Sequence, residues 1–320
     1  MNPEPWPALP LADWLPTYAT LHRWTQIVGK TRLGLAPFEN HWWNCTLYVT
    51  TRGLTTSTMP YRSGGGGGGG GVVEVEFDFL DDALLARTDG GETRSLRLEN
   101  KSVADFYKEY RAMLADLGVQ VRIVPTPNEV ADATPFPEDR AHATYAGDAA
   151  RRCWRSLVQA DRLLKQFRGG FAGKCSPSHF WWGGFDLACT RFSGRQAPAY
   201  TGVIPNCPSY VMREAYSREC ISAGWWPGSP DAPVKEPAFY AYAYPEPAGC
   251  NVAPIRPAAA YYHKDMREWI LPYTAVRGAA DPDAMVLEFL ESTYATAASL
   301  GGWDVAALRS SRTEKHDPRR

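Results

Sequence analysis

Residues 173–191 read GKCSPSHFWWGGFDLACTR, and they repeat an earlier part of the same chain. Residues 29–52 carry the same residue types in the same order. The shared types are a Gly-Lys pair, a proline, a histidine, two adjacent tryptophans, a threonine and an arginine. Because self-similarity within a chain is typical of a repeated structural unit, the match predicts an internal duplication.

Hydrophobic periodicity on either side of the two stretches predicts a helix, several antiparallel strands and a final helix in each copy. The expected helices cover residues 13–28, 102–117, 148–167, 210–222 and 282–300. The expected strands cover residues 41–52, 54–59, 73–80, 93–98, 119–124, 179–192, 239–244 and 259–273. The first helix is expected to end at Gly29 and Gly34. The polyglycine run at residues 64–71 is expected to form a flexible hairpin loop, because glycine has the largest backbone entropy.

The alignment of the two copies sets the predicted fold class and domain organisation. The chain is expected to be an α+β protein of two helix-flanked antiparallel sheet units, related by a pseudo-twofold axis. The units span residues 1–124 and 148–303, and a proline-rich linker at residues 125–147 joins them. The second unit carries an insertion at residues 205–237, and a polar tail follows at residues 304–320.

The charge balance of the sequence argues against several classes of partner. It holds 34 Lys and Arg against 35 Asp and Glu, a formal net charge of -1, and so offers no basic field for nucleic acid. No apolar run is long enough to span a membrane, and no basic segment leads into an apolar one at the N-terminus. Seven cysteines without a CxxC pair favour a reducing compartment. We expect a cytoplasmic protein without nucleic-acid or membrane partners, and the sequence leaves the oligomeric state open.

Three separated motifs give the chain a family resemblance. They lie at residues 40–57, with the NHWW and LTTS segments, at residues 182–195 and at residues 214–228. Together they resemble the domain of unknown function 5996 family of uncharacterised bacterial proteins, over residues 6–303. The resemblance implies a whole-length domain and no known activity. The family pattern has a histidine after the Tyr and Ser of the third motif, where this chain has Arg218, which can hold an anion but offers no imidazole.

Two lysines and two histidines are the first candidates for a functional site. Lys30 and Lys174 each follow a glycine, and His41 and His179 each begin a Trp-rich strand. A lysine can bind an anion while a nearby imidazole acts as a general acid or base near neutral pH. A cleft between the two copies would collect both pairs. The alternative is architectural, since lysine is favoured at a helix C-terminus and each histidine would be a half-buried strand residue.

Further candidates complete this expected site. Arg191 and Arg195 flank a turn and would bind an anionic group, and Glu219 would act as an acid or base. Asp186 and Arg191 are an odd number of residues apart, so in an ideal strand their side chains face opposite sides of the sheet. The expected aromatic walls are Trp43, Trp182 and Trp226. The alternative is that the arginines and the glutamate are solvated surface residues.

No motif in the sequence indicates a cofactor or a metal. HxH, HxxxH and CxxC spacings, phosphate-binding loops and dinucleotide fingerprints are missing, so we expect no cofactor and no metal site. The 12 tryptophans and 16 tyrosines indicate an aromatic-walled pocket or an aromatic-rich sheet. These features predict a cofactor-independent enzyme that acts on a small anionic or aromatic molecule in an inter-repeat cleft. The alternative is a non-catalytic module that binds a small molecule or a partner in the same pocket.

Overall fold

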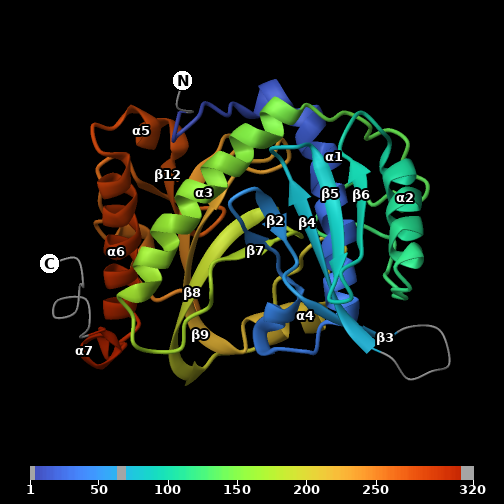
Figure 1. Ribbon diagram of the computed structural model, residues 1–320. Coiled ribbons are helices and arrows are strands. Elements are labelled where there is room, and N and C mark those ends of the chain that lie inside the picture. Colours follow the sequence, from blue (N-terminus) through green and yellow to red (C-terminus); the bar gives the residue numbers. More distant parts are fainter. Residues whose placement is uncertain (1–3, 63–69, 311–320) are drawn as a thin grey trace, which may run out of the picture.

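The computed structural model describes residues 4–62 and 70–310, and it shows an α+β protein with two antiparallel sheets (Figure 1). Most of the expected polyglycine loop, and the expected tail beyond residue 310, lie outside the described residues. Gly70 and Gly71 belong to a strand and not to that loop, because they pair with Arg62 and Tyr61.

The first sheet is built from short strands that mostly pair in the order in which they occur along the chain. Its order is β1-β2-β4-β5-β6, and β3 pairs with the start of β4. The strands are β1 (Tyr48–Val49), β2 (Gly53–Thr55), β3 (Met59–Arg62), β4 (Gly70–Asp78), β5 (Ala83–Thr88) and β6 (Thr93–Arg97). In β4, Val73, Val75 and Phe77 are fully buried while Glu74 and Glu76 are half-buried, which is the alternation expected of a strand with one wet face.

The second sheet has the order β7-β8-β9-β10-β12-β11. Its strands are β7 (His179–Trp181), β8 (Asp186–Gln196), β9 (Arg218–Trp226), β10 (Ala238–Tyr244), β11 (Tyr261–His263) and β12 (Glu268–Pro272). Trp225 on the central strand β9 pairs with Leu187 of β8 on one side and with Phe239 of β10 on the other. All three side chains are buried and belong to the main core, so this face of the sheet is its core face.

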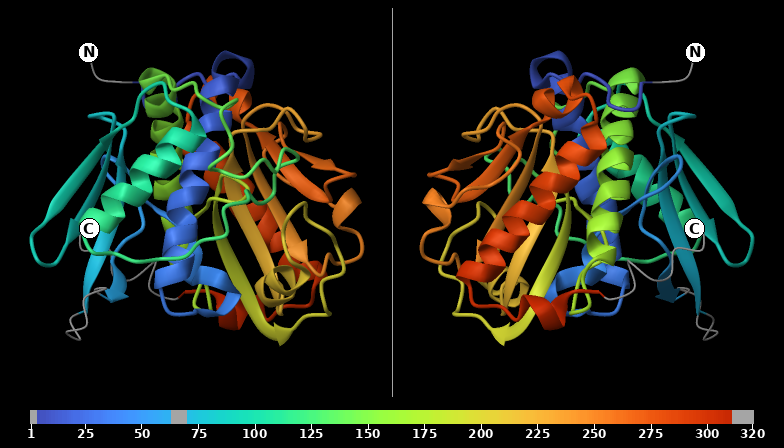
Figure 2. Two further views of the ribbon diagram at one scale, coloured as in Figure 1. Left: turned by 90° about the vertical axis from the view of Figure 1, so that its right-hand side faces the viewer. Right: turned by 90° about the vertical axis from the view of Figure 1, so that its left-hand side faces the viewer.

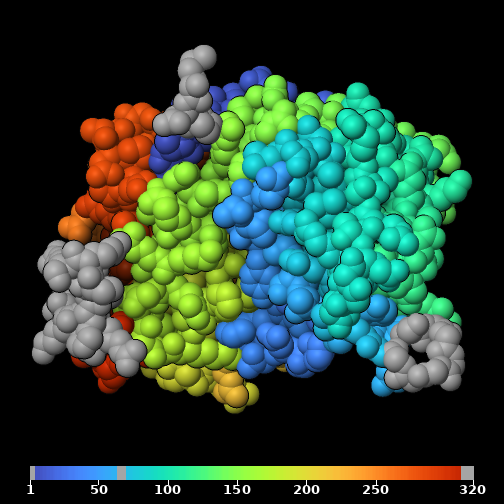
Figure 3. All heavy atoms as spheres, in the orientation of Figure 1, coloured from blue at the N-terminus to red at the C-terminus, as the bar shows by residue number. Residues whose placement is uncertain are grey.

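Four long helices pack around the two sheets. They are α1 (Leu11–Leu35), α2 (Val103–Asp116), α3 (Gly147–Gly169) and α6 (Pro282–Leu300), and the short ones are η1 (Asn40–Cys45), α4 (Ser209–Ala215), η2 (Cys250–Val252), α5 (Tyr273–Gly278) and α7 (Val305–Leu308). Figure 2 shows α1 upright between the two sheets and α6 against the second sheet. Helix α3 contacts α1, α6 and strands of both sheets, and Figure 3 shows its residues at the surface between the two halves of the molecule.

Helix α1 continues past Gly29 and Gly34 to Leu35, so the expectation that these glycines end it is wrong. The reason is packing. A Cβ on Gly29 would overlap the indole of Trp182, and one on Gly34 would press on Val121. The glycines therefore allow close approach of other segments to a helix that is buried on nearly all sides. Lys30 consequently lies inside the helix and not after it.

The helix expected at residues 210–222 is also wrong in extent. Helix α4 ends at Ala215, and strand β9 begins at Arg218. Residues 220–225 are buried one after another and pair with β8 on one side and β10 on the other. A strand in the middle of a sheet is buried on both faces, which removes the alternation that identifies strands in a sequence. Glu219 and Trp226 therefore lie on a central strand.

The remaining differences concern irregular or short segments. Residues 40–45 form the 3-10 segment η1 instead of the start of a strand, with left-handed φ values of 59° at His41 and 61° at Trp42. Strand β5 is absent from the sequence expectations, and no strand occurs at residues 119–124. Three expected strands each divide into two: residues 54–59 into β2 and β3, residues 179–192 into β7 and β8, and residues 259–273 into β11 and β12. The helices expected at 102–117, 148–167 and 282–300 are confirmed within two residues.

One cluster of buried side chains runs through both halves of the described chain. The N-terminal segment contributes to it by reaching across the molecule. Trp6 packs against Phe239 and Tyr273, and its carbonyl accepts a hydrogen bond from Arg277 Nε at 2.9 Å. Both halves show the order helix, antiparallel sheet, helix, as predicted. The pseudo-twofold axis and the boundaries of the two units stay predictions.

Candidate functional site

His41 and Lys174 form a direct pair, although they come from different halves of the chain. Lys174 Nζ lies 2.8 Å from His41 Nε2. His41 Nδ1 faces the carbonyl oxygens of Glu214 and Ala215 at 3.2 and 3.1 Å, so Nδ1 carries the proton and Nε2 accepts from the ammonium. Burial and the neighbouring ammonium lower the pKa of His41, and burial lowers the pKa of Lys174.

The backbone around His41 is held in an uncommon conformation. His41 and Trp42 both have left-handed φ values, which are unfavourable for side chains with a Cβ. The His41 N–H donates to Glu214 Oε1 at 3.0 Å, and Trp42 Nε1 donates to the Val211 carbonyl at 3.0 Å. Helix α4 thus holds η1 in place, and the imidazole stays over the ring of Phe192 at 4.6 Å. Strained residues that are fixed in this way concentrate at functional sites.

Trp43 connects this pair to the second predicted histidine. Its ring centroid lies 5.6 Å from that of His41 and 5.7 Å from that of His179. His179 is 1% exposed, and it is also in contact with Tyr48 and Trp181. Neither of its ring nitrogens has a hydrogen-bond partner among the described residues. Burial, reinforced by nearby arginines, lowers the pKa of His179 to about 3. The imidazole is therefore neutral near pH 7 and is only a weak base there.

A second group of titratable residues lies on the other face of the second sheet, away from the core. We call this surface the tyrosine face; Asp186, Tyr240, Tyr242 and Glu268 lie on it. The Tyr240 hydroxyl donates a hydrogen bond to Asp186 Oδ2. Tyr240 reaches Asp186 across β9 because its ring lies over Gly224, where a Cβ would overlap both the Tyr240 ring and the Leu187 carbonyl.

The carboxyl groups of the tyrosine face have unusual proton affinities. Burial raises the pKa of Asp186 to about 6, and burial together with the charge of Asp186 raises the pKa of Glu268 to about 8. Both residues nevertheless remain half-buried, so part of their surface is accessible. Tyr240 has a pKa well above its usual value because of burial and the adjacent carboxylate, and it keeps its proton. Such shifts near neutrality are characteristic of acid–base sites.

Lys30 and Glu129 extend this group beside the turn between β7 and β8. Burial lowers the pKa of Lys30 to about 8, and its ammonium lies 5.4 Å from the centroid of the Trp182 ring and donates to Asn128 Oδ1. Although Glu129 is exposed as a residue, its carboxyl lies against Gly183, and desolvation raises its pKa to about 7. Glu129 and Lys30 influence each other's proton affinity.

Residues between β8 and β9 contribute further tyrosines to the tyrosine face. Tyr216 and Tyr242 share a hydrogen bond between their hydroxyls at 2.8 Å, and Tyr200 stacks on Tyr216 with centroids 4.9 Å apart. Trp226 is half-buried beside Ala188 and Tyr240 on the same face. All three predicted wall residues, Trp43, Trp182 and Trp226, are therefore aromatic neighbours of titratable groups.

The structure places the other three predicted site residues elsewhere. Arg191 is 1% exposed on the core face, stacked on Phe167 and Tyr294 with its guanidinium 3.3 and 4.3 Å from their ring centroids. Arg195 Nε donates to Glu219 Oε2 at 2.7 Å, and its two terminal nitrogens donate to the carbonyls of Gly301 and Gly302 at the end of α6. Neither the arginines nor Glu219 lie with the His41–Lys174 pair.

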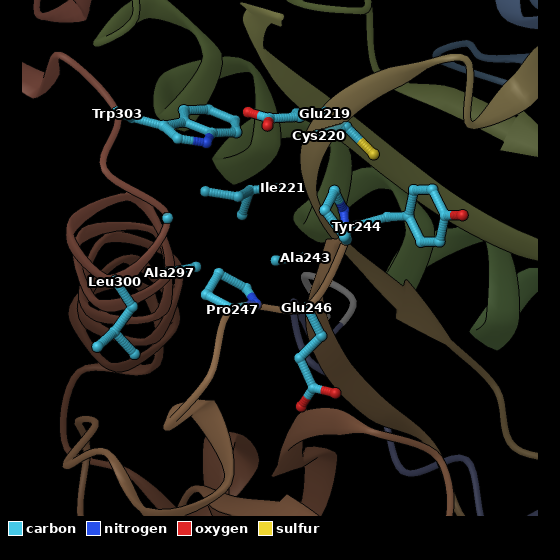
Figure 4. Close-up of a pocket in the computed structure, with 12 residues that line it drawn as sticks. Glu219, Cys220, Ile221, Ala243, Tyr244, Glu246, Pro247, Ala297, Leu300 and Trp303 are labelled. Carbon is cyan, nitrogen blue, oxygen red and sulfur yellow. The ribbon is translucent and has the colours of Figure 1, made fainter. Parts of the chain in front are cut away.

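Glu219 instead lines a small pocket of about 150 Å³ at the C-terminal end of α6. Figure 4 shows Leu300 and Ala297 of α6 on one side of it and Glu246 on another. Glu219 is bound by Arg195, and Glu246 is bound by Arg267 and accepts from the Tyr262 hydroxyl. The two carboxylates of this pocket are thus neutralised by the protein itself.

Several functional candidates are missing from the sequence analysis. Tyr240, Glu268 and Glu129 are not among its site residues, and Asp186 appears there only as a neighbour of Arg191. One signal was present: the alternation in residues 238–244, AFYAYAY, places every tyrosine on one face of a strand. The neighbours on β8 and β12 follow only from the strand order, which a single sequence does not give.

The described part of the chain contains neither a metal-binding cluster nor a membrane-spanning helix. Within residues 4–62 and 70–310, no three His, Cys, Asp or Glu side chains gather into a group that could hold a metal ion. The helices of the same residues include none with the length and apolar character needed to cross a membrane.

Comparison with known proteins gives one match. No curated protein and no solved structure matches the chain. The model of one family, described as a family of unknown function (DUF5996), matches residues 6–310 of the 320. The match includes both sheets, the His41–Lys174 pair and the tyrosine face, so all the candidate sites belong to the matched region. The chain is therefore a member of the DUF5996 family.

Proposed function

We propose that the tyrosine face binds a small molecule and that Asp186 acts on it as a general base. The observation that carries the proposal is the hydrogen bond from Tyr240 to a half-buried carboxyl whose pKa is about 6. A carboxylate with a pKa near neutrality can take a proton from a substrate and return it later. Tyr240 fixes Oδ2, and Oδ1 has no side-chain hydrogen-bond partner among the described residues.

Two further carboxyls supply the complementary acid. With pKa values of about 7 for Glu129 and about 8 for Glu268, a substantial fraction of each is protonated at pH 7, when Asp186 is mostly ionised. A site in which one carboxyl is ionised and its neighbours are protonated contains a base and an acid at the same pH. This arrangement needs no cofactor, and the proposed enzyme is cofactor-independent.

The chemistry of the face supports an aromatic substrate that carries an amine or another cationic group. Trp181, Trp226 and Tyr242 offer half-buried aromatic surface, and the ionised Asp186 attracts a cation. Lys30 and Trp182 would orient the substrate at the turn before β8. An anionic substrate, which the sequence predicts as one of two classes, fits less well because three carboxyls face this region.

The His41–Lys174 pair lies at the opposite end of the same face. Asp186 and Phe192, on which His41 stacks, are separated by about 20 Å of extended strand. One small molecule does not contact both ends, so the proposal assigns the reaction to the Asp186 end. His41, Lys174, Trp43 and His179 remain candidates for a second binding region. Arg191, Arg195 and Glu219 have no part in it, given their positions.

Three broader predictions stand beside this proposal. We infer that the two halves arose by duplication, which the shared order of helix, antiparallel sheet and helix supports. The net charge of -1 supports a protein without nucleic-acid partners. The unpaired cysteines, all free in the structure, support a cytoplasmic location.

The proposal is tested with a panel of aromatic amines and matched aromatic carboxylates. Thermal unfolding at pH 7 is measured with each compound, and compounds that raise the Tm are incubated with the protein and followed by NMR for conversion. We expect amines to raise the Tm and carboxylates to leave it unchanged. Turnover of a converted amine should increase with pH through about 6, as Asp186 loses its proton.

Variants separate the proposed site from the rest of the protein. Asp186→Asn keeps the shape and still accepts from Tyr240, so it should fold and lose turnover by about 100-fold or more. Tyr240→Phe should weaken binding. Glu219→Gln, on β9 beside the C-terminal end of α6, is the matched control and should behave like the unaltered protein. Equal activity of Asp186→Asn and the unaltered protein would place the reaction elsewhere and refute the proposal.

The alternative function is a non-catalytic binding module on the same face. The stacked Tyr200 and Tyr216 favour it, because aromatic surface with neutral donors is sufficient for binding. In that case the amines raise the Tm, no compound is converted, and Asp186→Asn reduces the Tm shift without any effect on chemistry.

A further inference from the structure

The thiols of Cys175 and Cys189 lie next to each other on the core side of β8. Their sulfur atoms are 3.5 Å apart. The segment that carries Cys175 runs antiparallel to β8: the Ser176 N–H donates to the Thr190 carbonyl at 2.9 Å, and the Phe192 N–H donates to the Lys174 carbonyl at 3.0 Å. These backbone hydrogen bonds hold the two thiols together.

The two thiols differ in accessibility and in proton affinity. Cys175 is partly exposed, whereas Cys189 is 0% exposed. A hydrogen bond from the Cys189 thiol and the nearby Arg191 and Arg168 lower the pKa of Cys175, while the same contact raises that of Cys189. An accessible thiol that ionises easily, beside a protected second thiol, is the arrangement of a reactive and a resolving cysteine.

We infer that Cys175 and Cys189 are a thiol-oxidation site that forms a reversible disulfide when the protein meets hydrogen peroxide. The Cys175 thiolate attacks one peroxide oxygen, the O–O bond breaks, and a sulfenic acid and hydroxide result. The Cys189 thiol then attacks the Cys175 sulfur and displaces hydroxide, which leaves as water with the proton of Cys189. The peroxide is reduced to water, and the two thiols are oxidised to one disulfide; a dithiol reverses the change.

The geometry is compatible with this bond. Cys175 lies opposite Arg191 in an isolated bridge, so Cys189 is its diagonal neighbour on the same face of the paired segments. Bond formation has to shorten the sulfur separation from 3.5 Å to about 2.05 Å, a displacement that side-chain rotation and a small shift of the 173–178 segment can supply. Formation of the disulfide moves the segment that carries Lys174. Because the Lys174 ammonium contacts His41, the oxidation also affects the edge of the tyrosine face.

The experiment uses the full-length reduced protein treated with a small excess of hydrogen peroxide. Intact mass under non-reducing conditions should show a loss of two hydrogen atoms, and proteolytic mapping should identify a Cys175–Cys189 linkage within one chain. Dithiothreitol should restore the original mass. Oxidation that adds oxygen atoms without a linkage, or that joins separate chains, would overturn the inference.

Matched variants test the assigned order of the two thiols. In Cys189→Ser, dimedone should trap a sulfenic acid at Cys175; in Cys175→Ser, peroxide should leave the buried Cys189 unmodified. Cys207→Ser is the control, because Cys207 is also partly exposed but burial raises its pKa to about 11. It should form the linkage normally.

A measurement on the unaltered protein avoids any effect of substitution on folding. With iodoacetamide at pH 7, Cys175 should be alkylated about tenfold faster than Cys207, because the higher thiolate fraction of Cys175 outweighs its lower nucleophilicity. Equal or faster alkylation of Cys207 would contradict the assignment. This result is independent of the proposed function of the tyrosine face.

Discussion

Individual carboxyls on the tyrosine face work against the stability of the fold at high pH. Glu268 has a folded-state pKa of about 8, above the value of about 4.5 in the unfolded chain. A raised pKa means that the folded state binds the proton more tightly, so the associated stabilisation is complete below pH 4.5 and is lost as pH rises through 8. His22 has the opposite effect, since burial lowers its pKa to about 4 and stability is lost as pH falls below about 6.5.

We predict that Glu268→Gln makes the protein relatively more stable as the pH increases from 5 to 8. Glutamine is neutral throughout, so the variant avoids the desolvation of a buried carboxylate that the unaltered protein suffers. The Tm of both proteins is measured at pH 5 and pH 8. Comparison at each pH cancels the contribution of His22, which both share. A Tm difference that stays constant over this range contradicts the raised pKa.

At this scale the sequence predicted some contacts and missed others. The repeat predicted that Lys30, Lys174, His41 and His179 gather in one cleft between the copies, and of these the structure brings Lys174 and His41 to 2.8 Å. The opposite orientation of Asp186 and Arg191 is confirmed, since strand alternation is local information. The Tyr240–Asp186 hydrogen bond was not predictable, because it requires the order of three strands and the gap above Gly224.

Single elements were predicted best where their pattern is local and strongly periodic. Helix α6 matches its expected residues because a proline begins it and Gly301 follows it. The insertion helix and the end of α1 failed for a shared reason: tertiary contacts overrode the local signal. Gly29 packs under Trp182, and residues 218–226 are completed as a strand by pairing with β8 on one side and β10 on the other.

The element-scale prediction concerns β9 at its closest approach to Tyr240. Gly224→Ala should lower the free energy of unfolding by about 1–3 kcal/mol, because the new methyl group overlaps the Leu187 carbonyl and the Tyr240 ring. Urea unfolding measures the change. Gly169→Ala, on α3 with no atom near the added Cβ, is the control and should change stability by less than about 1 kcal/mol. Equal stability of both variants would contradict the close packing.

The whole molecule has a core that crosses the predicted boundary between its halves. Helix α1 belongs to the first half, yet Tyr18 packs on Phe185 at 5.2 Å and His22 faces the Gly183 carbonyl at 2.8 Å. The sequence predicted two units from their repeated order, but the interface between them depends on shape and was not visible in either copy. A repeat pattern identifies the units and says little about how they pack.

We therefore predict that a fragment of residues 1–146 does not fold by itself. Without α3 and β8, the fragment leaves one side of α1 exposed to water, which removes much of the apolar burial that stabilises a domain of this size. Circular dichroism and thermal unfolding are the measurements. Co-expression with residues 147–310 is the control and should restore a folded complex. A cooperative thermal transition in the fragment alone would show that the halves are independent domains.

The N-terminal segment adds a consequence for synthesis on the ribosome. Trp6 finds its partners in Phe239, Tyr273 and Arg277, which are made more than two hundred residues later. At translation rates of about 5–20 residues per second, roughly 12–50 s pass between the synthesis of Trp6 and the synthesis of those partners. During that interval the indole is an exposed aromatic group on a growing chain, available to a chaperone or to a neighbouring nascent chain. The contacts of Trp6 with Phe239, Tyr273 and Arg277 therefore form only after those residues have been synthesised.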